Sequence, residues 1–480
     1  MKNKLVFKLL CILVLTFGLI TSLYAQNSFV YLNVGGTASN GFVAGFAVGG
    51  NGSLVNVPGS PFSTGAGSVS FGNGIVASWL GRLYVSGDRG AQVSGFSIDP
   101  STGVLTPIPG SPFDTATGIL GGLRFAITPD QQFLFALNGS TGKLATFRIG
   151  AGGSLMRLPM IVSTLAFSSN VAKAMKISKD GKFLFVAEGI SGIGVGVFRI
   201  GSDGVLTRVF GTLFTPASEC DAMSLELNCA GNLIFVLSQC GEVFVFNVAT
   251  DGSLTQIAGS PFSFAIRAGY EHLVLNTAGN LMFVSNISSA QIFVLGVSAT
   301  GAVSPVPISS INLTNPSNED TRPVDLALNR EDTLLYVNSA DGTIFDFNIS
   351  PTGMLSPVLG SPFPGGGSYG ASIAAFPPKT CGPVFDLCIQ DDSNTNILRI
   401  NSVTGEYQFA NCSGVIAQGT AALTRKGCLT TLQQYGPDKR FLARIDSCQN
   451  NATASLQLLS QGAILTIIDR NTLDDSCVCR

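Results

Sequence analysis

The sequence predicts an all-β protein, a seven-bladed β-propeller followed by a small disulfide-rich β domain. Two observations predict this fold. A stretch of eleven residues is repeated seven times at intervals of 48 to 52 residues, and a strongly apolar strand recurs in the same phase. The composition agrees, because 57 glycines and only 12% charged residues suit many tight turns between buried strands.

Residues 1–25 predict a secretory signal peptide. They have a basic start (Lys2, Lys4, Lys8), an apolar run over residues 9–20 and a small residue, Ala25, at the end. An uncleaved membrane anchor is the alternative. With cleavage we expect a secreted, cell-surface or periplasmic protein without a membrane span, because no second run of 18 apolar residues follows.

The charge balance argues against a nucleic-acid partner. Loss of three of the 27 Lys and Arg residues with the signal peptide leaves 24 against 29 acidic residues, a net charge of −5. Binding to nucleic acid requires clustered Lys and Arg, and the mature chain contains no basic run longer than two.

Residues 26–378 hold the repeats. The seven copies are GSLVNVPGSPF at 52, GVLTPIPGSPF at 103, GSLMRLPMIVS at 153, GVLTRVFGTLF at 204, GSLTQIAGSPF at 252, GAVSPVPISSI at 301 and GMLSPVLGSPF at 353. The recurring apolar strands begin at Phe29, Leu83, Phe133, Phe183, Leu233, Leu281 and Leu334. A unit of about 50 residues with four short strands is typical of a propeller blade, whereas a coil of a β-solenoid is about half as long.

The strands of one unit differ in their expected places. The unbroken apolar run predicts a strand in the middle of the blade, buried on both faces. The repeated stretch predicts the outer edge strand, because three copies carry a proline (Pro107, Pro305, Pro357), which cannot donate to a central ladder. Its Gly-Ser-Pro-Phe ending predicts a turn back toward the axis, with a phenylalanine packing between blades. The repeated stretch is therefore expected to be architectural rather than ligand-binding.

The two ends of the repeat region predict how the ring closes. The chain enters at a second strand, Phe29, and the repeats finish with ASIAAFPP, residues 371–378, which matches inner strands such as LRFAITPD from Leu123. We therefore expect the last strand to complete the first blade, which removes the open sheet edge.

The cysteines of the propeller predict one disulfide. In ECDAMSLELNCAGNLIFVLSQCGE the turn is centred on Ala230 and Gly231, so that Cys220 faces Cys240 across the hairpin. Cys229 lies at the other end of the hairpin. Its possible partners are the cysteines of the C-terminal region, whose number is odd.

Residues 379–480 predict a separate Cys-rich β domain. Their seven cysteines indicate a disulfide framework in an exported chain. NILRINSVTGEYQFANC alternates around a turn and predicts a hairpin, and ALTRKGCLTTLQQ and AILTIIDRN predict further strands. Metal binding through Cys477 and Cys479 is an alternative, but the paired Cys-x-x-Cys spacing of zinc sites is absent. We predict neither a metal site nor a cofactor.

Polar residues occur at aligned positions of the predicted inner strands. One register holds Arg124, Ala174, Ser224, His272 and Asp325, and a second holds Ala126, Lys176, Glu226, Val274 and Ala327. A convergent group of Arg124, Lys176, Glu226, His272 and Asp325 would combine a cation, a base and an acid, as general acid-base catalysis requires. The favoured interpretation is that these groups pair with one another and with water.

One unit of the chain resembles a known enzyme family. KISKDGKFLFVAEGISGIGVGVFRIGSDGVLTRV, residues 176–209, is similar to the seven-bladed lactonase family, which includes bacterial 6-phosphogluconolactonases. The resemblance covers roughly residues 28–378 in repeat length, blade count and strand order. It implies a ligand site at one mouth of the central channel, and lactone hydrolysis by a polarising cation with a base or acid.

The local motif of that family is only partly present. In the family, the motif consists of Pro-Arg-His before an inner strand, then Asp-Gly, then Tyr-Val-x-Asn-Glu. In the fourth unit, Asp180, Gly181 and Glu188 match, whereas Ala172, Lys173 and Ala174 stand at the Pro-Arg-His places. The single histidine, His272, occupies the equivalent place two units later. The resemblance therefore makes Glu188 a further candidate site residue and divides the motif between two blades.

Three functions follow as hypotheses. The favoured one is an exported binding or interaction propeller that takes a small molecule, a sugar or a protein at the channel mouth or top face. The second is an extracellular lactone hydrolase of the 6-phosphogluconolactonase type, and the third is a structural surface component. Most other enzyme classes are excluded, because one histidine cannot build their sites and no GxSxG or phosphate loop occurs.

Overall fold

The computed structural model describes residues 28–379 apart from 36–40, 66–73, 79–80, 88–90, 119–121, 165–171, 190–192, 210–219, 265–268, 315–320 and 368. Beyond residue 379 it describes the backbone of strands β33 to β41. The predicted signal peptide lies outside these residues. The regular structure described is β-strand, with one 3-10 turn, η1 (Ala151–Gly153).

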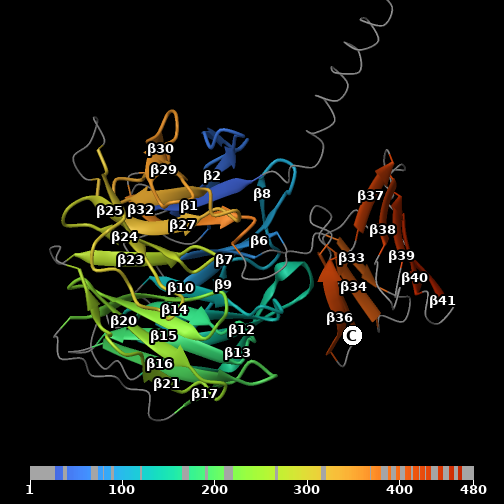
Figure 1. Ribbon diagram of the computed structural model, residues 1–480, viewed down its shortest axis with the longest axis horizontal. Coiled ribbons are helices and arrows are strands. Elements are labelled where there is room, and N and C mark those ends of the chain that lie inside the picture. The colour runs from blue at the N-terminus through green and yellow to red at the C-terminus, as the bar shows by residue number, and fades with distance from the viewer. Residues whose placement is uncertain are drawn as a thin grey trace, which may run out of the picture.

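Seven antiparallel sheets form a closed ring (Figure 1). The first strand of each sheet lies nearest the axis and contacts the first strands of both neighbouring sheets, all the way round. These inner strands are, from blade 1 to blade 7, β32 (Tyr369–Phe376), β5 (Ile75–Ser78), β10 (Leu123–Ile127), β14 (Ala172–Ile177), β18 (Ala222–Leu227), β23 (Tyr270–Leu275) and β27 (Pro323–Leu328). The predicted seven-bladed propeller is confirmed.

The apolar runs form the second strand of each blade, as the sequence predicts. These strands are β1 (Phe29–Gly35), β6 (Arg82–Ser86), β11 (Phe133–Asn138), β15 (Phe183–Gly189), β19 (Leu233–Ser238), β24 (Leu281–Asn286) and β28 (Leu334–Ser339). Every residue of β11, β19 and β24 is buried, because adjacent blades cover both faces of the strand. The third strands are β2 (Gly41–Val48), β7 (Gln92–Ile98), β12 (Lys143–Ile149), β16 (Ile193–Ile200), β20 (Glu242–Val248), β25 (Gln291–Gly296) and β29 (Thr343–Ile349).

The repeated stretch supplies the outer strand, in agreement with its prolines. The outer strands are β3 (Leu54–Asn56), β8 (Leu105–Pro107), β13 (Leu155–Ser163), β17 (Leu206–Arg208), β21 (Leu254–Gln256), β26 (Ser309–Asn312) and β30 (Leu355–Pro357). Where the copy ends in Gly-Ser-Pro-Phe, a two-residue strand follows: β4 (Phe62–Ser63), β9 (Phe113–Asp114), β22 (Phe262–Ser263) or β31 (Phe363–Pro364).

Gly-Ser-Pro-Phe does not turn back toward the axis, which corrects the sequence prediction. β8 and β9 both pair with β7, so the chain continues along the same edge after a gap. Inside the gap the amide of Gly95 donates to Oγ of Ser111 at 2.9 Å, and the Gly95 carbonyl accepts from Ile108 at 2.9 Å. Ser60, Ser260 and Ser361 accept equivalent bonds, each at 2.9 Å. The serine thus satisfies a backbone amide that the interrupted ladder leaves open.

The four phenylalanines of these copies pack between blades, as predicted. Phe62 lies against the core shared by blades 1 and 2, and Phe113 against the core shared by blades 2 and 3. Phe262 and Phe363 have the same role between blades 5 and 6 and between blades 7 and 1. Each therefore contributes apolar burial to a blade junction.

The ring closes as the sequence predicts. β32, the last strand of the repeats, pairs antiparallel with β1, from Phe29 opposite Phe376 to Gly35 opposite Tyr369 (Figure 1). Blade 1 therefore combines strands from both ends of the propeller, and no inner strand is left unpaired at the junction.

The C-terminal region contains two antiparallel sheets. One consists of β33 (Leu387–Gln390), β34 (Asn396–Ile400), β35 (Glu406–Asn411) and β36 (Gly414–Thr420). The other consists of β37 (Ala422–Lys426), β38 (Leu429–Gln433), β39 (Leu442–Asp446), β40 (Thr453–Leu458) and β41 (Ala463–Ile467). The predicted hairpin corresponds to β34 and β35. The disulfide framework predicted for residues 379–480 falls outside the described residues.

Candidate functional site

The inner strands carry their polar side chains in two tiers around the axis. The first tier holds Arg124, Ala174, Ser224, His272 and Asp325, and the second holds Ala126, Lys176, Glu226, Val274 and Ala327. The pairing of the inner with the second strands places the members of each tier at equivalent positions. The tiers are two residues apart on each strand, so their side chains leave the same face.

His272 and Asp325 are paired in the first tier. Nε2 of His272 lies 3.2 Å from Oδ1 of Asp325. Asp325 also accepts hydrogen bonds from the Ser372 hydroxyl and from the backbone amides of Leu326, at 2.8 Å, and Ile373, at 3.0 Å. These bonds fix the carboxylate, which in turn orients the imidazole.

The environment of His272 keeps its ring uncharged at neutral pH. Desolvation lowers the pKa of His272, and the neighbouring Asp325 carboxylate raises it only in part. The charges of Lys176 and Arg124 also lower the pKa of His272, and that of Glu226 raises it. With Nε2 held by Asp325, Nδ1 is the remaining nitrogen. It is buried and has no hydrogen-bond partner among the described residues.

The second tier contains one ion pair. Nζ of Lys176 lies 2.9 Å from Oε2 of Glu226, and Oε1 of Glu226 accepts from the amide of Leu227 at 3.2 Å. The side chains of Lys176 and Glu226 are 40% and 17% exposed, so solvent weakens this pair. Arg124 in the first tier donates from Nε to the Lys173 carbonyl at 2.8 Å.

These contacts link one blade to the next. Arg124 joins blade 3 to blade 4, Lys176 joins blade 4 to blade 5, and His272 joins blade 6 to blade 7. Further links are the Leu273 amide to Ser224 Oγ (3.3 Å), the Ser372 hydroxyl to Asp325, Asn33 Nδ2 to the Ser86 carbonyl (3.1 Å) and the Leu123 amide to Ser86 Oγ (3.0 Å). Together they form a belt around the whole axis, in agreement with the interpretation that the polar groups pair with one another.

Lys379 belongs to the same region, which sequence reasoning missed. Its Nζ donates to the Leu275 carbonyl at the end of β23 and lies 3.9 Å from Oδ1 of Asp332. Burial lowers the pKa of Lys379, while the charges of Glu226 and Asp332 raise it. The sequence assigned Lys379 to the start of the next domain, because no repeat or motif marks it.

Glu188 lies apart from the axial group. It is buried on β15 and forms a two-pronged ion pair with Arg208 of β17, at 3.3 and 3.1 Å. The Arg208 guanidinium also lies over the Phe198 ring, with its Cζ 5.3 Å from the ring centroid. A buried, bidentate pair of this kind binds β15 to the outer strand of its own blade.

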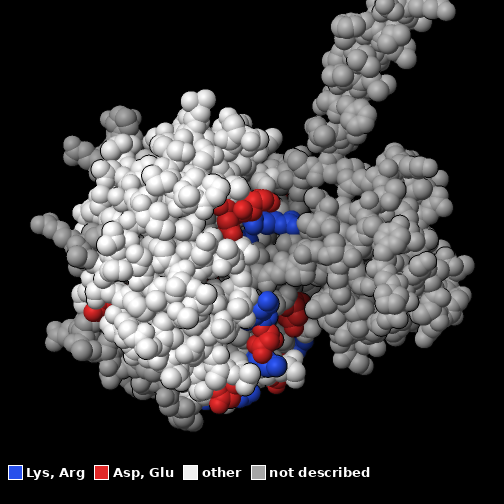
Figure 2. Space-filling view, in the orientation of Figure 1, with Lys and Arg blue, Asp and Glu red and all other residues white. Residues whose placement is uncertain are grey.

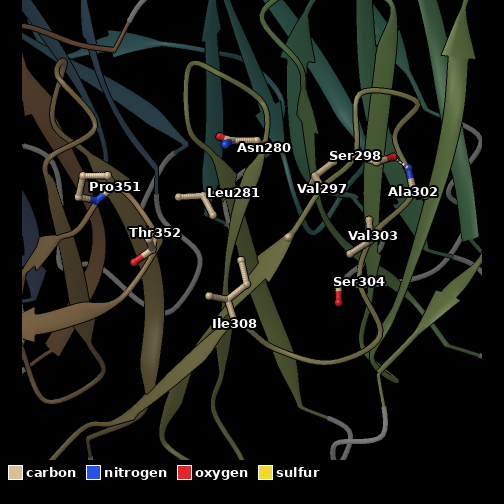
Figure 3. Close-up of a pocket in the computed structure, with 11 residues that line it drawn as sticks. Asn280, Leu281, Val297, Ser298, Ala302, Val303, Ser304, Ile308, Pro351 and Thr352 are labelled. Carbon is tan, nitrogen blue, oxygen red and sulfur yellow. Dashed lines mark hydrogen bonds between the residues drawn. The ribbon is translucent and has the colours of Figure 1, made fainter.

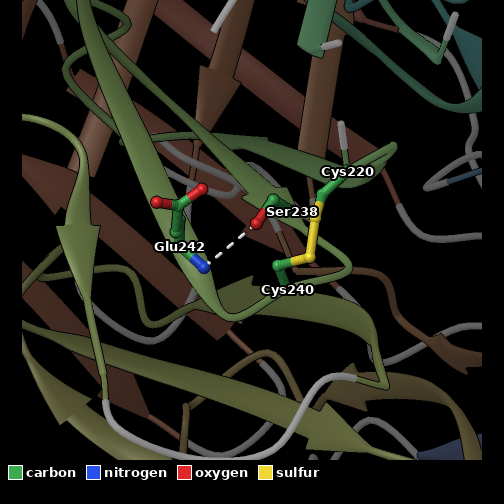
Figure 4. The surroundings of a disulfide bond; sticks show 4 residues. All are labelled: Cys220, Ser238, Cys240 and Glu242. Atoms are coloured by element: carbon green, nitrogen blue, oxygen red, sulfur yellow. Dashed lines mark hydrogen bonds between the residues drawn. A yellow bond between two sulfur atoms is a disulfide. The ribbon is translucent and has the colours of Figure 1, made fainter. Parts of the chain in front are cut away.

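The predicted hairpin disulfide has the predicted pairing (Figure 4). Cys220 precedes β18, Cys240 follows β19, and their Cα atoms are 5.9 Å apart. In the adjoining turn the Glu242 amide donates to Oγ of Ser238 at 3.0 Å. Cys229, at the opposite end of the hairpin, is also disulfide-bonded.

A groove on the outer rim lies apart from the axial group (Figure 3). Its volume is about 630 Å³, and it runs between blades 6 and 7. Figure 3 shows Pro351 and Thr352 of blade 7 on one side and Ile308, Val303 and Ser304 of blade 6 on the other. Here the copy GAVSPVPISSI lacks Gly-Ser-Pro-Phe, and only a Val297–Val303 bridge precedes β26.

Charged groups are unevenly distributed over the surface. Figure 2 shows a face on which they are sparse except along one edge, over the region of β8 and of β12 and β13.

Within the described parts of the chain, no three His, Cys, Asp or Glu side chains are arranged to hold a metal ion. In the same residues, no helix is long and apolar enough to cross a membrane.

Comparison with known proteins identifies the family. The family described as "Lactonase, 7-bladed beta-propeller" matches residues 125–365, half of the chain. The protein belongs to this lactonase family. No match was found among the curated proteins.

Solved structures of similar fold include members named as lactonases. A putative 6-phosphogluconolactonase from Bacteroides fragilis is 18% identical with a TM-score of 0.59, covering 73% of this chain and 98% of its own. The periplasmic gluconolactonase of Pseudomonas aeruginosa is 20% identical with a TM-score of 0.59, covering 72% and 99%. A functionally unknown protein from Desulfotomaculum acetoxidans is 14% identical with a TM-score of 0.52, covering 73% and 99%. At these identities the likeness establishes the fold.

Proposed function

We propose that this lactonase-family protein is an exported binding propeller, which holds a small hydroxyl-rich ligand such as a sugar at the first-tier end of the axis. Arg124 and Asp325 carry hydrogen-bond donors and acceptors there, on two of the inner strands. Such groups suit the hydroxyls of a sugar, because each polar contact fixes the orientation of the ligand.

The proposal that binding occurs without turnover rests on the surroundings of the two ring nitrogens of His272. Lactone opening requires a base that takes a proton from water while the carbonyl oxygen gains charge. Nε2 of His272 is bonded to Asp325, and Nδ1 is buried. Neither nitrogen can reach a water above the first tier unless the ring leaves its present position.

Three features support export. Residues 1–25 have the pattern of a signal peptide, and the Cys220–Cys240 pair suits an oxidising compartment. One protein of similar fold, from Pseudomonas aeruginosa, is named as periplasmic.

Lactone hydrolysis is the second candidate, favoured by family membership and by the pairing of His272 with Asp325. In this case a rotated His272 would take a proton from water, the water oxygen would attack the carbonyl carbon of the ring, and Arg124 would stabilise the oxyanion. The intermediate would then collapse with cleavage of the ring C–O bond, and the imidazolium would return its proton to the departing hydroxyl oxygen. Each such contribution is typically worth about 10²–10³ in rate.

A melting-temperature screen combined with a hydrolysis assay tests both candidates. We expect gluconate, glucose or δ-gluconolactone to raise the melting temperature of the mature protein, since a ligand of the folded state stabilises it. The shift should disappear in Arg124→Ala and persist in Arg157→Ala, whose guanidinium is exposed on β13. We expect no hydrolysis of δ-gluconolactone or its 6-phosphate above the spontaneous rate. His272→Ala should keep affinity within about threefold, under about 1 kcal/mol.

Two results would contradict this proposal. Turnover that disappears in His272→Ala, with an unchanged melting temperature, would make the protein a lactone hydrolase. If no sugar or lactone shifts the melting temperature and none is hydrolysed, the small-ligand proposal fails and a protein partner or structural role takes its place.

A further inference from the structure

The outer parts of three adjacent blades form a surface without charged side chains. This uncharged rim consists of residues 291–312 of blade 6, 347–364 of blade 7 and 41–63 of blade 1, which contain no Asp, Glu, Lys, Arg or His. Asp346, in the middle of β29, is buried. Figure 2 shows the surface over β25, β29 and β30 without charged groups. In blades 2 to 5 the corresponding parts carry exposed charges, such as Asp99, Lys143, Asp203 and Asp251.

The uncharged rim also holds most of the exposed large apolar side chains of the described residues. Five of the seven lie on it: Val55, Val306, Ile308, Met354 and Leu359. The other two, Met156 and Met160, lie on β13 of blade 3. A concentration of exposed apolar groups on one part of a surface indicates a contact with another molecule.

The three blades adjoin one another at this rim. Oγ of Ser309 on β26 donates to the Gly353 carbonyl of blade 7 at 2.9 Å, and β26 contacts β30. A Cβ on Gly52 would lie 3.0 Å from the Val358 side chain, which places the first repeat turn of blade 1 against the residue that follows β30. The exposed apolar side chains of the three blades therefore belong to one continuous surface, with β30 in its middle.

β30 has a hollow at one end and a projecting side chain at the other. The groove between blades 6 and 7 is lined by Pro351 and Thr352, which precede β30, and by Ile308 across from them (Figure 3). Leu359 follows β30 by two residues and is 84% exposed. The same rim thus carries both an apolar groove and a side chain that could fill one.

We propose that the uncharged rim binds a second copy of this protein in a twofold-symmetric dimer, in which the two β30 strands lie antiparallel. A twofold axis at Ser356, in the middle of β30, places Leu359 of each copy at the groove of the other. Both copies use the same surface, so the contact closes after two copies and does not continue into a filament.

Charge favours a second copy as the occupant of this rim. The chain has a net charge of −2 with residues 1–25 and −5 without them, so two copies repel each other over the rest of their surfaces. Contact through the uncharged rim brings no like charges together and removes no charged group from water. A nucleic acid or a charged peptide finds no complementary group there.

Sedimentation velocity of the full-length mature protein tests the dimer. We expect a dimer at about 10 µM. About 0.5 M NaCl should not weaken it, because no ion pair holds the copies together. Leu359→Asp and Val306→Asp should each weaken association at least about tenfold, since the new carboxylate would lose its hydration in the contact.

Met156→Asp is the matched control for these variants. Met156 is 60% exposed, close to the 69% of Val306, but it lies on blade 3. This variant should therefore dimerise like the wild type. Circular dichroism of each variant verifies that the propeller is folded.

A cysteine cross-link tests the position of the twofold axis. Ser356→Cys should form a disulfide between two copies under a mild oxidant, because the axis brings residue 356 next to its counterpart. Thr106→Cys is the control, since Thr106 has the same place on β8 of blade 2. On a non-reducing gel Ser356→Cys should cross-link at least about tenfold faster than Thr106→Cys or the wild type.

Four results would overturn the proposal. The first is a wild type that stays monomeric at about 100 µM, which would leave the rim to a different partner. The second is a dimer that Leu359→Asp and Val306→Asp leave intact or that Met156→Asp weakens equally. The third is an open series of larger oligomers, and the fourth is equal cross-linking of Ser356→Cys and Thr106→Cys.

Discussion

Asp346 is a buried carboxyl group on β29 without a hydrogen-bond partner for its side chain among the described residues. It lies opposite Tyr336 on β28. In blades 1 and 2 the equivalent position is Gly45 or Gly95, and the tyrosine opposite donates to the carbonyl of Gly103 or Gly153, at 2.7 and 2.9 Å. Burial raises the pKa of Asp346 to about 8, because the charged form loses its hydration.

Asp346→Asn should stabilise the protein at high pH. The unfolded chain releases the Asp346 proton near pH 4, whereas the folded protein keeps it up to about pH 8. Wild-type stability therefore falls as the pH rises through this window. We expect Asp346→Asn to gain about 2–5 kcal/mol over the wild type at pH 9 and little at pH 4, measured by denaturant unfolding.

Asp99 is the control for this substitution. Hydrogen bonds from Ser101 and Thr102 lower the pKa of this exposed carboxyl to about 2. Asp99→Asn should therefore give no stabilisation at pH 9. A wild-type stability that is the same at pH 5 and pH 9, with Asp346→Asn parallel to it, would show that Asp346 is not buried in its neutral form.

At the scale of the element, the first glycine of each repeat marks a contact between blades. All seven glycines have φ between 73° and 89°. A Cβ at each would meet the first side chain of the second strand in the preceding blade. The pairs are Gly52 with Leu334, Gly103 with Phe29, Gly153 with Arg82, Gly204 with Phe133, Gly252 with Phe183, Gly301 with Leu233 and Gly353 with Leu281. Glycine therefore recurs at this position for two reasons: the backbone is left-handed there, and a side chain of the preceding blade lies too close for a Cβ.

Gly252→Ala should destabilise the propeller more than a glycine substitution that affects the backbone alone. Its Cβ would lie 2.5 Å from the Phe183 ring at a φ of 86°. We expect a loss of about 2–4 kcal/mol in denaturant unfolding, from backbone strain and overpacking together. Gly152, with a φ of 72° and nothing within 4 Å of a Cβ, is the control, and Gly152→Ala should lose about 1–2 kcal/mol. Equal losses would exclude the inter-blade contact as a cause.

At the scale of the whole molecule, stability depends on closure of the ring by β32. Removal of this strand takes away the inner strand of blade 1, leaves the edge of β1 unpaired and removes the packing of β32 against β5 and β27. We expect a chain that ends at Gly366 to aggregate or to lack a cooperative thermal transition, whereas a chain that ends at Lys379 melts cooperatively. Circular dichroism and size-exclusion chromatography distinguish these outcomes. Equal melting temperatures for the two chains would contradict the closure.

The sequence determined the features that are repeated or local in the chain. Periodicity set the number of blades, unbroken apolar runs marked the second strands, and prolines marked the outer ones. The position of the turn in one hairpin set Cys220 opposite Cys240, which is a contact within about 20 residues. The direction of the chain after Gly-Ser-Pro-Phe was not predictable, because it depends on a bond from a neighbouring strand to the serine hydroxyl.

Only the tertiary structure decided which partner each polar side chain of the candidate site contacts. The sequence aligned Arg124, Lys176, Glu226, His272 and Asp325, but the partner of each lies about 50 residues away in another blade. Which neighbour each side chain reaches depends on the twist and spacing of the inner strands, and not on a local pattern. The same reason hid the Glu188–Arg208 pair and the place of Lys379, since a side chain that is used once leaves no periodic signal. Composition and repeats determine where the strands lie. Pairing between blades determines which charges are neutralised and which nitrogen of His272 has no hydrogen-bond partner among the described residues.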